Sequence, residues 1–475
     1  AKDKSKGKKT WSYEAINVRD FAFNSSRRLV WDAMAADVEG KKVMCMSYYG
    51  KEAYPIYRKY STKAVYHTIK TYSKFTIAYP YPVAISVEAS IGMEYPMIAM
   101  NYGRAEKDGT YSEATKYGAI GVIIHEVGHN FFPMIINSDE RQYWWMDEGL
   151  NTFVQFLTEQ EFDNNYPSRR GPAHLIADYM KLPKDMLEPI MTKGDNVASV
   201  GSNAYAKAAT GLNILRETIM GRELFDYAFK EYARRWAFKH PTPNDLFRTM
   251  EDASAVDLDW FWRGWYFGTD PVDIAIDSVK WFRLDANKNL ASMKAPEFET
   301  ISKVRNRDDK NLIYYTNTDT TLRDYYYYNR AADAKMFQDM AQQQLDAQKD
   351  NANYATWEDK HFYELQFSNK GGMVMPIIVE WTFTDGSKEV DRIPVGIWKL
   401  NEQKVTKLFA KNKEVVGIKL DPMRETADIN ESNGMWPVRE MPSRFQLFKG
   451  ASTISGLGAP RGGGPSINAM QKAKK

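Results

Sequence analysis

Two of the six histidines in this 475-residue chain, His125 and His129, lie four positions apart with Glu126 between them. On a helix, residues i and i+4 point from the same face, so the two imidazole rings would lie together. Two neutral imidazoles in this arrangement suit a zinc ion. Glu126 would lie about 100° around the helix, where it could serve as the base for a metal-activated water without binding the metal. The pattern therefore predicts a hydrolytic metal centre.

A catalytic zinc site needs a third protein ligand and leaves a fourth position open. Glu148 is the candidate, because it begins the next predicted helix and a turn would bring it back to the histidines. Asp147 has two interpretations: it caps that helix, which we favour, or it accepts a hydrogen bond from a ligand histidine. The histidines could instead be hydrogen-bonded core residues. Apolar residues flank them on both sides, and buried ionisable groups need a reason, so the metal site is favoured.

The segments that would position these residues change in character along the chain. Residues 41–50 and 83–91 are rich in β-branched and aromatic residues and predict strands, and residues 56–78 between them have helical spacing. From about 111 to 270 the pattern is helical, and it includes one long helix over 112–132 that carries the histidines. After residue 270 strand-like alternation returns, with an Asp-Gly hairpin signal near residue 385.

Composition excludes several classes of protein. The formal charge is +3, from 64 basic and 61 acidic residues, which argues against a nucleic-acid-binding protein. No apolar run reaches the roughly 18 residues that a transmembrane helix requires. The single cysteine, Cys45, excludes an internal disulfide and is expected to be a small buried hydrophobe. The compartment stays open, with a periplasmic or secreted location favoured over the cytoplasm.

The chain resembles a known family at this point. His125-Glu126-x-x-His129, eighteen further residues and then Glu148 resemble the gluzincin pattern of the M1 family of zinc aminopeptidases. The resemblance implies that His125, His129 and Glu148 bind one Zn²⁺ ion per chain. It also implies that Glu126 activates the water that attacks the substrate.

Two further stretches resemble motifs of the same family. The segment "AYAKAATGLNILRETIMG" is similar to the family's Tyr-x-Lys-Gly helix start, which implies that the Tyr205 hydroxyl stabilises an oxyanion, although Ala208 replaces the glycine. The segment "IGMEYP" is similar to the family's Gly-x-Met-Glu-Asn strand, with Ile91 and Tyr95 as departures. This resemblance implies that Glu94 binds the α-ammonium group of the substrate by a charge-assisted bond, which would make the enzyme an exopeptidase.

The resemblance also implies an α+β fold, with a thermolysin-like catalytic domain whose second half is mainly helical, followed by a small antiparallel β-sandwich domain. Members of the family carry a large N-terminal β domain, which is expected as a partner because the chain begins in what looks like its exit. The expected division is the exit of that domain at 1–25, the catalytic domain at 26–269, a connecting strand and polar Tyr/Gln-rich insertion at 270–360, the sandwich at 361–430 and a Gly-rich flexible tail at 431–475.

These expectations describe a zinc metallopeptidase that acts on peptides, and an aminopeptidase is the favoured form. One alternative is an endopeptidase of the same class, which would keep the metal chemistry and lose the amine anchor. Another is a non-catalytic interaction module that retains the fold. Such a module would be expected to have lost a ligand or the base, and the sequence has lost neither.

Overall fold

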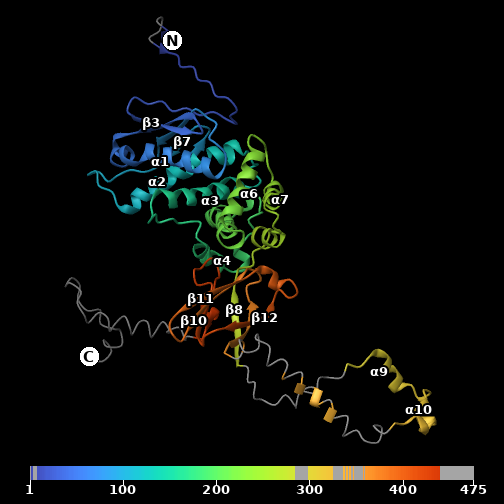
Figure 1. Ribbon diagram of the computed structural model, residues 1–475. Helices are drawn as coiled ribbons and strands as arrows, with labels where there is room; N and C mark the ends of the chain where they lie inside the picture. The colour runs from blue at the N-terminus through green and yellow to red at the C-terminus, as the bar shows by residue number, and fades with distance from the viewer. Residues whose placement is uncertain are drawn as a thin grey trace, which may run out of the picture.

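The computed structural model describes residues 2–3, 8–283, 298–324 and 359–438, with a few isolated positions between 335 and 357. Much of the expected polar Tyr/Gln-rich insertion, and the Gly-rich tail from residue 439, lie outside the described residues. The fold is α+β: an N-terminal mixed sheet, a helical middle part and C-terminal antiparallel sheets follow one another in space as in sequence (Figure 1). No helix in the described part of the chain is long and apolar enough to cross a membrane.

The N-terminal sheet has five strands in the order β3-β4-β5-β7-β6. The three central strands are parallel, and β3 and β6 pair antiparallel at the two edges. Two of its strands, β4 and β5, confirm the strands predicted from the sequence, and Cys45 is buried in β4 as expected. The strands are β3 (Val30–Val38), β4 (Lys41–Tyr49), β5 (Val83–Glu88), β6 (Met93–Tyr95) and β7 (Ile98–Asn101).

Three long helices connect this sheet to the centre of the molecule. Helix α1 packs on β3 and β4, and α2 and α3 pack against α1 and against each other. The predicted single helix over 112–132 is wrong at its end: α2 stops at Gly128 and the π-helix η2 follows. Helical geometry breaks at Phe132, because the residue before a proline, here Pro133, is disfavoured in the helical conformation. The elements are α1 (Tyr54–Phe75), α2 (Glu113–Gly128), η2 (Asn130–Ile135) and α3 (Trp144–Phe162).

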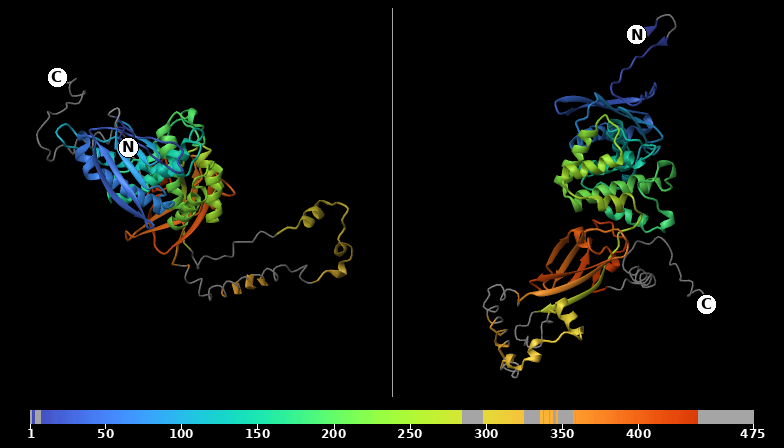
Figure 2. Two further views of the ribbon diagram at one scale, coloured as in Figure 1. Left: turned by 90° about the horizontal axis from the view of Figure 1, so that it is seen from above. Right: turned by 90° about the vertical axis from the view of Figure 1, so that its right-hand side faces the viewer.

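Of the remaining helices of the middle part, η6 and α5 pack against α3, and α6 packs against α7 and η7. Figure 2 shows the middle part from two further directions. Thr242 and Asp245 form a reciprocal capping box and Pro243 occupies the first turn, which together fix the start of α7. The elements are η3 (Ala173–Ile176), α4 (Ala177–Met180), η6 (Gly201–Lys207), α5 (Ala208–Ile214), η7 (Leu215–Ile219), α6 (Arg222–Trp236), α7 (Pro243–Ser254), α8 (Asp259–Phe261) and η8 (Trp262–Tyr266).

The C-terminal part contains two antiparallel sheets, in the orders β12-β9-β8 and β11-β10-β13-β14. The hairpin predicted near residue 385 joins β10 to β11. Strand β8, expected in a connecting segment, pairs with β9 along its length, so the β unit begins before residue 361. The strands are β8 (Ile274–Arg283), β9 (His361–Asn369), β10 (Ile377–Phe383), β11 (Lys388–Ile393), β12 (Lys404–Lys411), β13 (Val415–Leu420) and β14 (Met435–Trp436).

The long connection between β8 and β9 carries two short helices, α9 (Ile301–Asp308) and α10 (Tyr315–Thr318). Figure 1 and the left view of Figure 2 place them away from the sheets and from the helical part. Neither helix has a buried residue. The two helices therefore do not help to position the groups described next.

Candidate metal centre

The three predicted metal ligands converge on one point. The Nε2 atoms of His125 and His129 are 3.1 Å apart, and Oε2 of Glu148 lies 3.1 Å from the first and 3.4 Å from the second. Zinc bonds of about 2.0–2.2 Å in tetrahedral geometry would place ligand atoms roughly 3.3–3.5 Å from one another. The three atoms therefore fit one zinc ion, with two nitrogen ligands and one oxygen ligand of the types that zinc prefers.

Helix α3 supplies the groups that orient His125. Gln155 Oε1 lies 2.9 Å from His125 Nδ1, and the Asn151 amide donates to the backbone oxygen of His125 over 2.9 Å. Gln155 in turn donates to Glu159 over 2.8 Å. With Nδ1 carrying the proton toward Gln155, the Nε2 lone pair faces the metal position, as is usual for a histidine ligand.

The sequence reasoning missed these supporting residues, although a signal for them exists. Glu148, Asn151, Gln155 and Glu159 follow one another at intervals of three or four along α3, so they share one face. The rest of that stretch is largely apolar and buried. A polar row on a buried helix indicates a polar partner, here the histidine helix α2.

His129 is held from a different direction, and Asp147 has a different role from the favoured one. His129 Nδ1 is 2.8 Å from the backbone oxygen of Phe132 and 2.8 Å from Oδ1 of Asp147. The prediction that Asp147 caps α3 is wrong, because the helix already begins at Trp144 and its N-cap is Tyr143. Asp147 and Glu148 therefore lie inside the helix, and the alternative interpretation of Asp147 as a histidine partner describes its position.

Glu126, the predicted base, is buried beside the two histidines with 6% of its surface exposed. Burial raises the pKa of Glu126 to about 6, while the adjacent rings of His125 and His129 act to lower it. A carboxylate with a pKa near neutrality can both accept and return a proton, which is what a general base and acid must do. The geometry and the pKa of Glu126 both suit that task.

The other two predicted residues each lie beside a different ligand histidine. The Tyr205 ring, carried by η6, stacks on the His125 ring at a centroid distance of 5.6 Å. Burial, and then the negative charge of Glu148, raise the pKa of Tyr205, so its hydroxyl keeps the proton that it would donate. Glu94, on edge strand β6, has an oxygen within 4.8 Å of a His129 ring nitrogen and of the Asp147 carboxylate. The structure thus brings all six predicted residues together.

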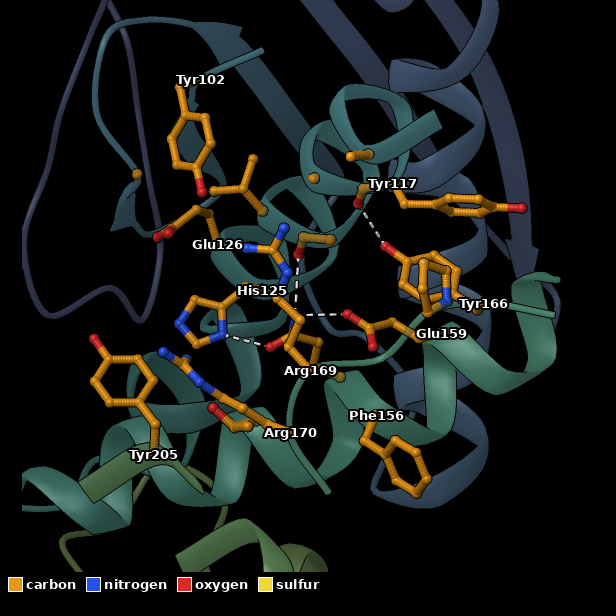
Figure 3. Close-up of a pocket in the computed structure, with 18 residues that line it drawn as sticks. Tyr102, Tyr117, His125, Glu126, Phe156, Glu159, Tyr166, Arg169, Arg170 and Tyr205 are labelled. Carbon is orange, nitrogen blue, oxygen red and sulfur yellow. Dashed lines mark hydrogen bonds between the residues drawn. The ribbon is translucent and has the colours of Figure 1, made fainter. Parts of the chain in front are cut away.

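A cavity of about 480 Å³ opens beside this cluster, within the range of small-ligand sites. His125, Glu126 and Tyr205 form one end, and the cavity follows the first half of α2 away from them (Figure 3). Its other labelled residues come from several elements and include two arginines that the sequence reasoning did not single out: Tyr102, Tyr117, Phe156, Glu159, Tyr166, Arg169 and Arg170.

A helix with the HExxH pattern, whose two histidines meet a glutamate of the next helix beside an open cavity, is the arrangement of a class of metal-dependent peptidases. Comparison with known proteins agrees. Residues 60–265 match the Peptidase family M1 domain, and this part of the chain is an M1 peptidase domain.

Individual relatives are distant. Glutamyl aminopeptidase of Sus scrofa is 26% identical over 181 residues, which cover 35% of this chain and 19% of that protein. Aminopeptidase M1-A of Oryza sativa subsp. japonica is 23% identical over 246 residues, covering 49% of this chain and 27% of the relative. The matched region thus spans roughly a fifth to a quarter of the length of these relatives.

A solved structure supports the fold at larger scale. Crystalline aminopeptidase A of Legionella pneumophila, in complex with aspartic acid, superposes with a TM-score of 0.53 and 12% sequence identity. The superposition covers 84% of this chain and 38% of the other. At this identity the likeness concerns the fold alone.

Proposed function

We propose that this chain is a zinc-dependent peptidase with a thermolysin-like catalytic domain, and that it removes N-terminal residues from peptides. The observation that carries the proposal is the convergence of two imidazole nitrogens and one carboxylate oxygen at 3.1–3.4 Å from one another. The M1 domain over residues 60–265 makes a hydrolase the expected class, and the similar proteins described above are named as aminopeptidases.

Each residue of the site has a separate role in the proposed hydrolysis of a peptide. Zinc held by His125, His129 and Glu148 would supply a Lewis acid that lowers the pKa of water and polarises the substrate carbonyl. Glu126 accepts the proton of the attacking water and passes it to the departing amine. Tyr205 donates a hydrogen bond to the carbonyl oxygen as that oxygen gains negative charge.

Glu94 determines which end of a peptide is cleaved. It lies beyond the metal ligands, on the edge strand, with His129 and Asp147 as its neighbours in the cluster. A carboxylate there would bind the α-ammonium group of a peptide by a charge-assisted bond and so hold the first peptide bond at the metal. An endopeptidase would have no use for such an anchor.

Metal content and activity together test the proposal. The purified protein is expected to bind one zinc ion per chain by mass analysis, and Glu148→Gln should lose most of that zinc together with hydrolysis of aminoacyl fluorogenic substrates. Glu161→Gln is the matched control, because Glu161 is on the same helix and pairs with Lys74 on its outer side. Equal zinc binding by the Glu148 variant would contradict the ligand assignment.

A second comparison separates the two kinds of peptidase. A peptide with a free N-terminus should be cleaved, and the same peptide with an acetylated N-terminus should resist cleavage. Glu94→Gln should reduce turnover of the free peptide. Efficient cleavage of the acetylated peptide at an internal bond would show an endopeptidase and remove Glu94 from the anchor role.

A further inference from the structure

Arg170 is a charged residue of the cavity that the proposed chemistry does not use. Arg170 belongs to the segment that connects α3 to η3, and it lines the cavity. Its guanidinium carbon lies 4.3 Å from the centroid of the Tyr205 ring, so the charge sits directly beside the proposed reaction centre (Figure 3). Among the described residues, no acceptor forms a hydrogen bond or an ion pair with this guanidinium.

Two acidic groups act on the charge of Arg170, Glu148 and Glu159, and both are already engaged. Glu148 lies 3.1 Å from His125 Nε2 in the ligand cluster. Both oxygens of Glu159 accept hydrogen bonds, from Gln155 over 2.8 Å and from Ser168 over 2.6 Å. Burial lowers the pKa of Arg170, which indicates that its charge is poorly compensated by the protein. A partly buried guanidinium with five unused donors is costly unless an anion occupies the space in front of it.

The position of Arg170 relative to Glu94 shows which part of a substrate would reach it. The cavity extends from His125, Glu126 and Tyr205 along α2 toward Tyr117, and Glu94 does not line it. With the α-ammonium group at Glu94 and the first peptide bond at the metal ligands, a peptide that continues past His125 and Tyr205 would place the residue after the scissile bond in the cavity. Arg170 then faces that residue.

We propose that Arg170 binds a carboxylate carried by the residue that follows the scissile bond. This inference rests on the proposed function and adds the substrate class. Arginine suits the role because its planar fork can hold a carboxylate through two parallel hydrogen bonds. The carboxylate has two possible sources, the free C-terminus of a dipeptide or the side chain of an acidic second residue.

Two pairs of substrates with the same N-terminal residue test the inference and separate the sources. The first pair is a dipeptide ending in alanine and its C-terminal amide. The second is a dipeptide amide with aspartate in second position and its asparagine analogue. We expect wild-type kcat/KM to be about 10- to 100-fold higher for the carboxylate member of at least one pair, as for a charge-assisted hydrogen bond. The pair that shows the preference identifies the source.

Arg170→Gln should reduce that preference to within about threefold, and Arg170→Lys should keep part of it, because the charge remains and the fork is lost. The preference is the ratio of kcat/KM for the two substrates of a pair, measured on the same variant. A general loss of activity caused by a shift of Tyr205 lowers both values and cancels in the ratio. Arg169→Gln is the matched control. Arg169 immediately precedes Arg170 in the chain and lines the same cavity, so this variant removes an equal charge from a neighbouring position. It should keep a larger share of the preference than Arg170→Gln.

The outcomes distinguish this inference from the proposed function. Hydrolysis of all four peptides with equal kcat/KM within each pair would overturn the role of Arg170 and would leave the proposed peptidase function intact. An equal loss of preference in the Arg169 and Arg170 variants would overturn the assignment to Arg170. The preference would then come from the overall positive charge of the cavity and not from one guanidinium group. Hydrolysis of none of the peptides by the zinc-loaded protein would refute the proposed function itself.

Discussion

Replacement of Gly149 by alanine is expected to impair catalysis without removing any catalytic group. Gly149 follows the ligand Glu148 on α3, at the point where that helix crosses η6 and α5. A Cβ atom added there would lie 2.5 Å from Cβ of Ala208 and 2.8 Å from the backbone oxygen of Ala204. Neither atom is the end of a flexible side chain, so the clash cannot be relieved by a rotamer change.

The size of the effect follows from the overlap. Carbon atoms in contact prefer about 3.5–4.0 Å, so the two helices must separate by about 1 Å. Tyr205 lies between Ala204 and Ala208 and would move with them, away from the His125 ring. Overpacking of this kind costs about 1–3 kcal/mol of stability, and a displacement of about 1 Å at a catalytic group can lower the rate by about 10²-fold.

The assay is kcat on an aminoacyl fluorogenic substrate, with zinc content and denaturant unfolding measured on the same preparations. Gly118→Ala is the control, because Gly118 lies on α2 along the same cavity and an added Cβ there meets no atom within 4 Å. The double variant Gly149→Ala/Ala208→Gly removes the closest contact and should recover part of kcat. Wild-type kcat and stability for Gly149→Ala would refute the proposed link between helix spacing and Tyr205.

Three further substitutions test single groups. Glu126→Gln should bind zinc normally and lower kcat by about 10²–10⁴-fold, as loss of a general base does; normal turnover would exclude it as the base. Tyr205→Phe should lower kcat by about 10²–10³-fold with zinc content intact, and an unchanged kcat would remove it from the site. Gln155→Leu deprives His125 Nδ1 of its acceptor and should weaken zinc binding about 10- to 100-fold in competition with a chromogenic chelator; unaltered affinity would leave Gln155 a packing residue.

The candidate metal centre could be predicted because its geometry is mostly local. The spacing of His125 and His129 fixes two rings on one helix face, and the apolar residues around them indicate burial. Glu148 could be predicted to reach the histidines on the single condition that α3 folds back against α2. The strands and helix of the N-terminal part were equally legible, since β4, α1 and β5 each carry a clear period of two or of about 3.6.

The features that were missed depend on contacts between distant segments. Asp147 was placed at a helix start because it precedes Glu148, but the buried Trp145 and Met146 extend α3 toward its N-terminus. No local pattern could show that Arg170 would lie over the ring of Tyr205, 35 positions further along the chain. The polar residues at intervals of three or four along α3, which include Gln155, could have been recognised in the sequence. Only the helix that they face, α2, would have had to be inferred.

Glycines at two helix crossings allow the close approach on which the site depends, and one of them, Gly149, explains how the site tolerates a departure from the family pattern. At Gly128 the absence of a side chain lets Tyr72 and Asn151 approach α2, where an added Cβ would lie 2.2 Å from the Tyr72 hydroxyl. Ala208 stands where the resemblance predicts glycine, yet the facing position on α3 is itself Gly149. The room needed for close approach is therefore provided on the other helix. Because the distance between two helices depends on both surfaces, the identity of either residue alone does not determine where Tyr205 lies.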